Sequence, residues 1–390
     1  MTPGAPLASI LLLLIFSQGV LPQAPTTPSP AEVASAIDLL GSLDDYSIRM
    51  NAARTVRRAE PTVVVAALER AARSHRDEYV RYRALVLLAG FGQPGTTALM
   101  RELMGDRNDR IRTVVFGWFE HHPDDAVVPA LIEALAVERS EFVRPALTRA
   151  LAAHGEDARA RDVLAPLVLR GEDFFRGTVI EALGDYRAAH ALPAIVSVAE
   201  LEGPLQDDAI TAIGMIGDPS VRLTLAGLQR SAPRELQPTI SASLCLLGFD
   251  CETQEGFVDR TLAFAAGTEG YEALLRGAVH AEGMLASRGR EPALEALFDR
   301  AMSAPEGVRA PIALGVGLIA FRTPTLMLRV LEARADLDGA VELLRDAFDM
   351  LNEDLEEERF FVEVRRAYWA APAGSAARRV AQTLITVLEF

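Results

Sequence analysis

Apolar residues recur three and four positions apart in successive short runs from about Ala31 onward. Gly, Pro and Asp collect between the runs, where helix ends and N-caps are expected. A spacing of three and four is the apolar stripe of an amphipathic helix, so the pattern predicts pairs of helices. The first five pairs are predicted at Ala31–Leu43 with Tyr46–Ala59, Thr62–Ser74 with Glu78–Phe91, Thr96–Met104 with Asp109–Glu120, Ala126–Val137 with Glu141–Ala153, and Ala158–Leu169 with Asp173–Leu183.

An arginine returns about every 32 residues, close to the start of the second helix of each pair. We call this set the arginine ladder; its members are Arg49, Arg81, Arg112, Arg144 and Arg176. Self-similarity at such a period is the signature of a repeat array. Each unit of an array buries its apolar face only against its neighbours, so a chain of this length needs no single large core.

The ladder changes character in the second half of the chain. Gln206 and Gln237 take the place of the arginine at intervals of 30 and 31 residues, and the interval then stretches to 39 before Arg276. Arg309 and Glu342 follow at 33 each. The change predicts two sub-arrays that differ in detail while keeping the same helix-pair unit.

The extra residues near Asp250–Gly256 and Gly267–Gly270 predict a long loop or a capping turn between the sub-arrays. An acidic run at 353–358 follows the last unit, and we interpret it as a solvated helix face. The predicted organisation is an N-terminal array at 31–250, a divergent array at 251–352 and capping helices at 353–390.

The second helix of each unit resembles the HEAT-repeat consensus, which has an acidic N-cap, an aliphatic residue before Arg, a later Ala and a closing Gly. Glu78–Ala84, closed by Gly92, and the run Ala209–Pro219 carry this resemblance. Val127–Leu135 and Ala191–Val196 resemble the opening helix of the family, in which Pro bends the run. The resemblance covers about residues 31–348. It implies an all-α fold, an α-solenoid of about ten helix-pair repeats.

Two roles are open for the ladder. Its place at the margin of the apolar stripe would let each guanidinium reach a carboxylate or a helix cap in the neighbouring unit. Acidic candidates lie about four residues earlier, at Asp45, Asp77 and Glu172. The alternative is a row that binds anions. Stacking requires periodic recurrence and binding does not, so we favour the structural role.

The opposite face of the second helices is the predicted inner surface of the solenoid. Its small, apolar and basic residues suggest a surface for a protein or peptide partner, although ordinary surface variety would give the same residues. The partner-binding candidates are Met50, Arg54, Arg57, Arg58, Tyr82, Val86 and Arg149.

The N-terminus carries an apolar run at residues 7–21, too short for a comfortable membrane span. It resembles the core of a secretory signal, although no Arg or Lys precedes it, and Ala24 is a candidate cleavage end. We expect a signal at 1–24 followed by a Pro/Thr-rich linker at 25–30, and hence a periplasmic or secreted protein. The alternative is an uncleaved anchor through residues 7–21 in the inner membrane.

Charge and motifs exclude several kinds of chemistry. The net charge is −15, and no stretch is basic enough to attract nucleic acid. The chain has no Lys, which rules out a Schiff base or a phosphate-loop lysine. His121 and His122 lie near carboxylates, but their spacing fits no zinc motif. We therefore predict no catalytic residues, no cofactor, no metal and no small-molecule substrate.

Cys245 and Cys251 are the two cysteines of the chain. In an exported protein they could pair, if a sharp turn brings Cys251, predicted in a loop, back to the helix that holds Cys245. The alternative is a small buried Cys245 and an incidental Cys251.

The resemblance implies an exported, non-enzymatic scaffold for a protein partner, an inference drawn from fold alone. Two other functions stay open. Some short HEAT-like proteins are lyases that attach phycobilin chromophores, and a membrane-anchored factor for envelope assembly or regulation would use the N-terminal run.

Overall fold

The computed structural model describes residues 27–42 and 45–390. Within these residues the chain forms helices and turns and no strand. The predicted signal or anchor at residues 1–24 lies outside the described residues. The all-α repeat fold expected from the sequence is confirmed.

The helices pair along the chain into ten repeats followed by a terminal pair. Repeats 1 to 5 are α1 (Pro30–Leu39) with α2 (Tyr46–Arg57), α3 (Pro61–Ser74) with α4 (Glu78–Phe91), α5 (Thr96–Leu103) with α6 (Asp109–His121), α7 (Val128–Val137) with α8 (Arg144–Ala152), and α9 (Ala158–Leu164) with α10 (Asp173–Asp185). Repeats 6 to 10 are α11 (Leu192–Ala199) with α12 (Gln206–Ile216), α13 (Arg222–Gln229) with α14 (Gln237–Leu246), α15 (Cys251–Ala266) with α16 (Glu272–Ser287), α17 (Glu291–Ser303) with α18 (Glu306–Arg322), and α19 (Pro324–Ala333) with α20 (Leu337–Leu351). The terminal pair is α21 (Asp354–Ala370) with α22 (Ala376–Val387).

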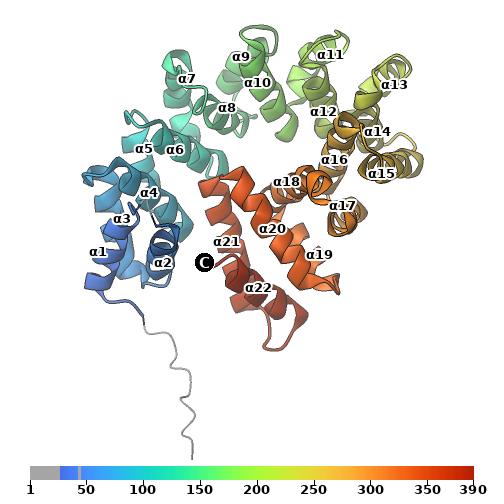
Figure 1. Ribbon diagram of the computed structural model, residues 1–390. Coiled ribbons are helices and arrows are strands. Elements are labelled where there is room, and N and C mark those ends of the chain that lie inside the picture. The colour runs from blue at the N-terminus through green and yellow to red at the C-terminus, as the bar shows by residue number, and fades with distance from the viewer. Residues whose placement is uncertain (1–26, 43–44) are drawn as a thin grey trace, which may run out of the picture.

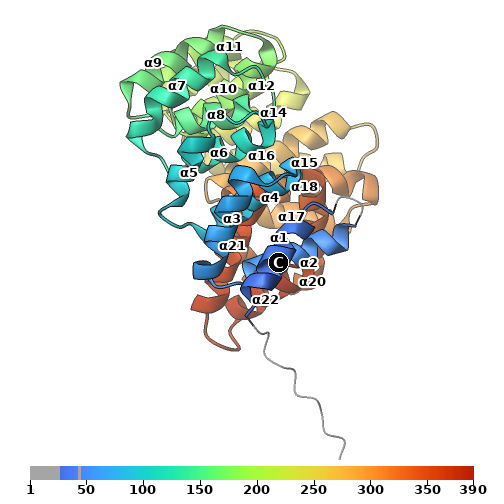
Figure 2. The same ribbon diagram turned by 90° about the vertical axis from the view of Figure 1, so that its left-hand side faces the viewer.

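The repeats curve into a nearly closed ring (Figure 1). In repeats 4 to 7 the first helices form the outer layer, and the second helices α8, α10, α12 and α14 form the inner layer. The ring closes where α21 packs against α4 of the second repeat. Figure 2 shows the same contact from the side, with α21 behind α3 and α4. The two ends of the array therefore meet, although some 270 residues separate them.

Local signals place the helix ends close to their predicted positions. α4 begins and ends at the predicted residues, and its C-cap Gly92 has φ +57, a left-handed conformation that glycine adopts without strain. Asp45, Asp77 and Asn108 accept hydrogen bonds from backbone N–H groups at the starts of α2, α4 and α6, so they are N-caps. Ser29 caps α1 in the same way, so Pro30, which the sequence pattern places in the linker, is the first residue of α1.

Proline marks a break at the start of two outer helices. The 3₁₀ turn η1 (Asp125–Val127) leads into α7, and η3 (Ala189–Ala191) leads into α11. A proline occupies the first turn of each α-helix, where its missing N–H costs nothing. The bent opening helix that the resemblance implied is thus a short 3₁₀ turn followed by an α-helix.

The predicted loop near Asp250–Gly256 is wrong. After Gly248 (φ +75) and Asp250 (φ +42), the chain enters α15 at once, and Gly256 lies inside this helix. The loop position expected for Cys251 is also wrong, because this cysteine is the first residue of α15. The extra residues of the 39-residue interval lengthen the first helix of repeat 8, because a single glycine weakens a helix without ending it.

The buried apolar residues form two clusters that meet at repeats 6 and 7. One runs from Val33 to Leu247 and the other from Met215 to Phe390. α14 packs against both α15 and α16, so the repeats stack without a gap at this point. The apolar contact is much smaller where the ring closes. Leu355 of α21 is the one apolar residue of the terminal pair that packs against the first cluster.

The ladder residues bond to the end of the first helix of their own repeat. In six repeats the side chain donates to a backbone carbonyl at or just beyond that end, where helical carbonyls lack partners. The pairs are Arg49 with Ser42, Arg81 with Ala72, Arg112 with Asp106, Arg176 with Val168, Gln206 with Ala199, and Gln237 with Gln229, at 2.7 to 3.0 Å. Glutamine can replace arginine because one N–H donor is enough for this bond.

Two arginines of the ladder also reach the next repeat. Arg81 pairs with Asp106, and Arg112 holds both oxygens of Glu138, at 2.8 and 3.1 Å. These two carboxylates come from the following repeat, whereas Asp45 and Asp77, four residues before a ladder arginine, are N-caps. Arg112 and Arg176 also pair with Asp109 and Asp173 of their own repeats. Arg144 differs again, since its guanidinium lies 4.3 Å from the ring centre of Phe175.

This division of roles predicts different outcomes for one substitution at two positions. Arg176→Gln should change the free energy of unfolding by less than about 1 kcal/mol, because Gln keeps the carbonyl bond and Asp173 is an exposed partner. Arg112→Gln should cost about 3 kcal/mol, because it leaves the buried Glu138 unpaired. Urea denaturation of both variants measures the difference, and equal losses would contradict the assignment.

A buried carboxyl in α16 predicts a pH dependence. Burial raises the pKa of Glu282 to about 8, with Asp259 and Glu255 adding to the shift. Because the folded-state pKa lies above the unfolded value, its contribution to stability is complete below about pH 4.5 and falls by about 1.4 kcal/mol per unit up to pH 8. Glu282→Gln should therefore gain stability over the wild-type chain at pH 8.5 relative to pH 5. Glu295→Gln, at an exposed position of α17, is the control and should show no such difference.

Candidate functional site: the inner surface of the ring

The centre of the ring holds a hollow with a volume of about 680 Å³. Its walls come from the inner helices of repeats 3 to 6, from α16 and α18 of the second half, and from the start of α21. Residues far apart in the sequence therefore face one space, which makes the hollow the main candidate for a binding site.

Three large apolar side chains line the hollow and remain exposed. Phe142 is 83% exposed, Phe174 is 59% exposed and Leu318 is 43% exposed. The aromatic pair stands two residues before the ladder residues Arg144 and Arg176. The sequence pattern did not single them out; their fixed register with the ladder is the signal that could have found them.

A charged network surrounds the apolar side chains. Arg149 donates to Glu120 and to Asp185, both at 2.8 Å, and Tyr186 donates to Glu120 at 2.9 Å. Arg322 from the second half of the chain reaches Glu181 at 2.6 Å. Arg149 thereby joins repeats 3, 4 and 5. Burial alone would lower the pKa of Arg149, but the two carboxylates outweigh it and raise the pKa.

The first three repeats present their inner surface to α21. Asp354 pairs with Arg83 and accepts a hydrogen bond from Tyr82, and Glu358 binds Arg57 at 2.6 Å. These contacts correct the sequence interpretation of the acidic run as a solvated face. Glu358 is only 2% exposed, because the run faces arginines of other repeats instead of water.

Other contacts extend the same interface. Glu356 lies 2.9 Å from His121, and burial of the Glu356 carboxyl is outweighed by this hydrogen bond and by nearby arginines, which together lower its pKa to about 2. Burial and the carboxylate of Asp354 raise the pKa of Glu357 to about 7. Neighbouring carboxyls of one helix turn thus differ widely in acidity.

Most of the predicted partner-binding residues have contacts within the same chain. Arg54 donates to Glu389 near the C-terminus, and Met50 lines a cavity of about 200 Å³ beside α21. Arg58 is exposed. Val86 is wrong as a contact residue, since it is buried in the core where no partner reaches it. Arg54, Arg57 and Tyr82 therefore all contact the C-terminal segment of the same chain.

The histidines considered as metal ligands have other roles. His121 faces Glu356, while His122 stacks on Trp118 with ring centres 3.6 Å apart and bonds to its carbonyl oxygen. Trp118 is itself buried.

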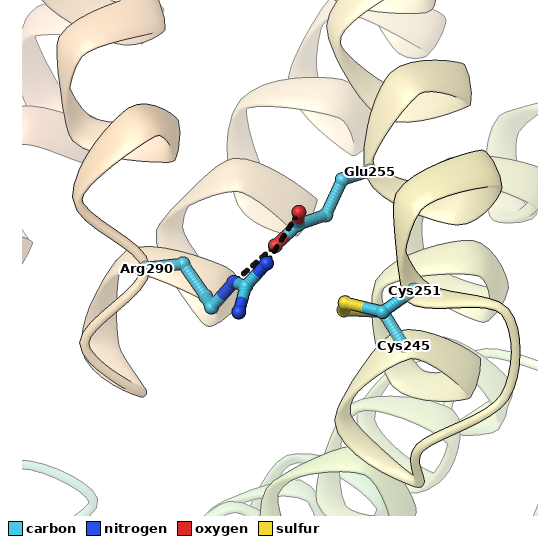
Figure 3. The surroundings of a disulfide bond; sticks show 4 residues. All are labelled: Cys245, Cys251, Glu255 and Arg290. Atoms are coloured by element: carbon cyan, nitrogen blue, oxygen red, sulfur yellow. Dashed lines mark hydrogen bonds and ion pairs between the residues drawn. A yellow bond between two sulfur atoms is a disulfide. The ribbon is translucent and has the colours of Figure 1, made fainter.

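Cys245 and Cys251 are joined by a disulfide between α14 and the start of α15 (Figure 3). They and Glu255 form the one cluster of three potential metal ligands among residues 27–42 and 45–390. The disulfide engages both sulfurs, and the Glu255 carboxylate pairs with Arg290. The chemistry of this cluster therefore does not suit a metal ion.

Over the described part of the chain, no single helix is both long and apolar enough to cross a membrane. The pair α18 and α19 passes a test of length and composition when taken together, but it is bent by 118°.

Comparison with known protein families finds a match in the first part of the chain. The family of HEAT repeats matches residues 33–117, which hold most of the first three helix pairs. Residues 33–117 therefore carry HEAT repeats, as the second-helix pattern predicted. No curated protein matches the sequence.

The solved structures that match the chain share little sequence with it. Escherichia coli YibA is 18% identical over 56% of this chain and 82% of its own, with a TM-score of 0.42. Yeast importin-beta (Kap95p) is 13% identical over 93% of this chain, with a TM-score of 0.39, and the match spans 58% of importin-beta. A chain from a structure of the interaction between cadherin and beta-catenin is 12% identical, covers 91% of this chain and 98% of its own, and has a TM-score of 0.30.

Proposed function

We propose that this protein is a non-enzymatic scaffold that binds a protein partner in the hollow at the centre of the ring. The observation that carries the proposal is the group of Phe142, Phe174 and Leu318, which line the hollow and stay exposed. Exposed apolar groups that gather in one concavity mark interaction sites, whereas singly scattered ones do not.

The surroundings of this group fit a polypeptide. Aromatic side chains are typical anchors of protein interfaces, and a rim of charged groups is their usual border. Here Glu141, Arg322 and Arg359 lie along the same hollow. Backbone and side chains of an extended or helical segment could meet both kinds of group at once.

Site-specific photocrosslinking tests the proposal. A benzophenone amino acid replaces Phe142 or Phe174 in the full-length chain, expressed in its native cell. We expect both positions to capture the same protein, identified by mass spectrometry. Leu223, 84% exposed on the outer helix α13, is the matched control and should capture none of it. Equal capture from Leu223, or capture of a small molecule alone, would overturn the proposal.

We further propose that the protein is exported, through a cleaved signal or an anchor at residues 7–21. The apolar run of the sequence supports this, and the disulfide suits an oxidising compartment. Cell fractionation with carbonate extraction separates the forms. A soluble periplasmic protein that lacks its first residues indicates cleavage, a carbonate-resistant pellet indicates the anchor, and a cytoplasmic protein refutes export.

A further inference from the structure

The inner surface of the first three repeats is shaped to receive α21. We call it the N-terminal inner face, made by Arg57, Tyr82, Arg83, Gly90, Gly117 and His121. A Cβ on Gly90 would lie 2.5 Å from Oε1 of Glu358, and a Cβ on Gly117 would lie 2.5 Å from Cδ2 of Leu355. A larger residue at either position would displace the Glu358 or Leu355 side chain from its place on the face, so both glycines leave room for these contacts of α21.

The interface between this face and α21 is mainly ionic. Leu355 is its one link to the first apolar cluster, and the cavity of about 200 Å³ beside it is lined by charged groups such as Arg49, Asp349 and Glu357. Contacts between successive repeats are, in contrast, mainly apolar, since buried residues from Val33 to Leu247 form one continuous cluster. Buried ion pairs give up much of their mutual attraction to desolvation, so they fix geometry more than they add stability. The contact of α21 with this face is therefore specific, and another helix with the same charges can replace α21.

The charges on the two sides are complementary. The chain carries a net charge of −15, yet the N-terminal inner face presents two arginines and a histidine. Opposite them, five of the six residues at 353–358 are acidic. The residues of α21 that touch the face are Asp354, Leu355 and Glu356, followed by Glu358 one helical turn after Asp354.

We propose that the N-terminal inner face is a binding site for an acidic helix of this pattern on a protein partner, and that α21 occupies it as an intramolecular ligand. The inference rests on the proposed function, because it assumes that the chain binds protein partners. It adds to the central hollow a second binding site, which is specific for an acidic helix. A tethered ligand has an effective concentration of about 1 mM or more, so a partner must bind well or α21 must be loosened first.

A peptide-binding experiment on the full-length chain tests this. The probe is a fluorescent peptide with the sequence of residues 352–371, and a scrambled peptide of equal charge is its control. The loosened variant carries Asp354→Asn and Leu355→Ala. We expect the loosened variant to bind the probe at least 10-fold more tightly than the wild-type chain in fluorescence anisotropy. Adding Arg83→Ala to the loosened variant should remove the gain.

Thermal melts and a milder variant guard against misfolding. If the double variant melts below the assay temperature, Asp354→Asn alone replaces it. Glu363→Gln, on the other side of α21, is the matched variant and should bind the probe no better than wild type. Equal affinity of wild type and the folded loosened variant, no binding by either, or binding of the scrambled peptide would overturn the inference. Crosslinking at Phe142 reports on the central hollow. Its failure would refute the proposed function, but it would not decide whether the N-terminal inner face binds the peptide.

Discussion

Glu358→Ala should open the ring. The Glu358 carboxylate lies between Arg57 and Arg365, at 2.6 and 3.1 Å, and the Arg57 side chain is only 6% exposed. Removal of the carboxylate leaves the buried Arg57 guanidinium and the half-buried Arg365 guanidinium without their counter-charge. A broken buried pair typically costs about 3 to 5 kcal/mol. The chain can relieve this cost by separating α21 from the N-terminal inner face, so that both arginines reach water.

Hydrogen exchange measures the opening. We expect protection of α2 and α4 to fall in Glu358→Ala, while α10 and α12 on the far side of the ring keep theirs. Glu363→Ala is the control on the same helix, because its partner Arg366 is 72% exposed and such a surface pair contributes under about 1 kcal/mol. A uniform loss of protection, or equal effects of both substitutions, would show that Glu358 does not specifically hold the ring closed.

Gly184→Ala should destabilise the array strongly. A Cβ on Gly184 of α10 would lie 2.7 Å from Cα of Ala212 in α12. The obstacle is backbone, which cannot rotate away, so two inner helices would have to move apart. Overpacking of this kind costs about 1 to 3 kcal/mol, and backbone contact puts Gly184→Ala at the upper end.

Gly283→Ala is the matched control, since a Cβ added to Gly283 of α16 would meet no atom within 4 Å. This substitution should be neutral or stabilise the chain by up to about 1 kcal/mol, because Ala favours a helix more than Gly does. Thermal and urea unfolding give both values. Similar stabilities of the two variants would mean that the close contact of α10 and α12 is not required.

Helix periodicity predicted most of the fold because the signals for it are local. The three-and-four spacing, the N-caps Asp45 and Asp77 and the closing Gly92 act within one or two helical turns. The positions of the ladder residues could be predicted from the sequence alone. The structure then explained why Gln206 and Gln237 can replace arginine, because each bonds to a backbone carbonyl. The loop predicted at Asp250–Gly256 failed because a glycine inside a helix and a glycine after one look alike in the sequence.

The candidate site was predicted less well. The 100° rule selected Arg149, which lines the hollow, and Tyr82, which contacts α21, but it also selected Val86, which lies in the core. The occupant of that face was missed. An acidic run looks the same whether it faces water or arginines, so the residues at 353–358 gave no sign that Arg57 and Arg83 lie opposite them.

The sequence by itself determined the repeat unit, the helix pairs and the side of each second helix that faces inward, because these depend on contacts within one unit or between neighbours. Only the tertiary structure decided that the array closes on itself. Each repeat turns slightly relative to the last, and the sum of these small rotations over ten repeats brings α21 to α4. No residue of either helix encodes that sum, which is a property of the whole stack.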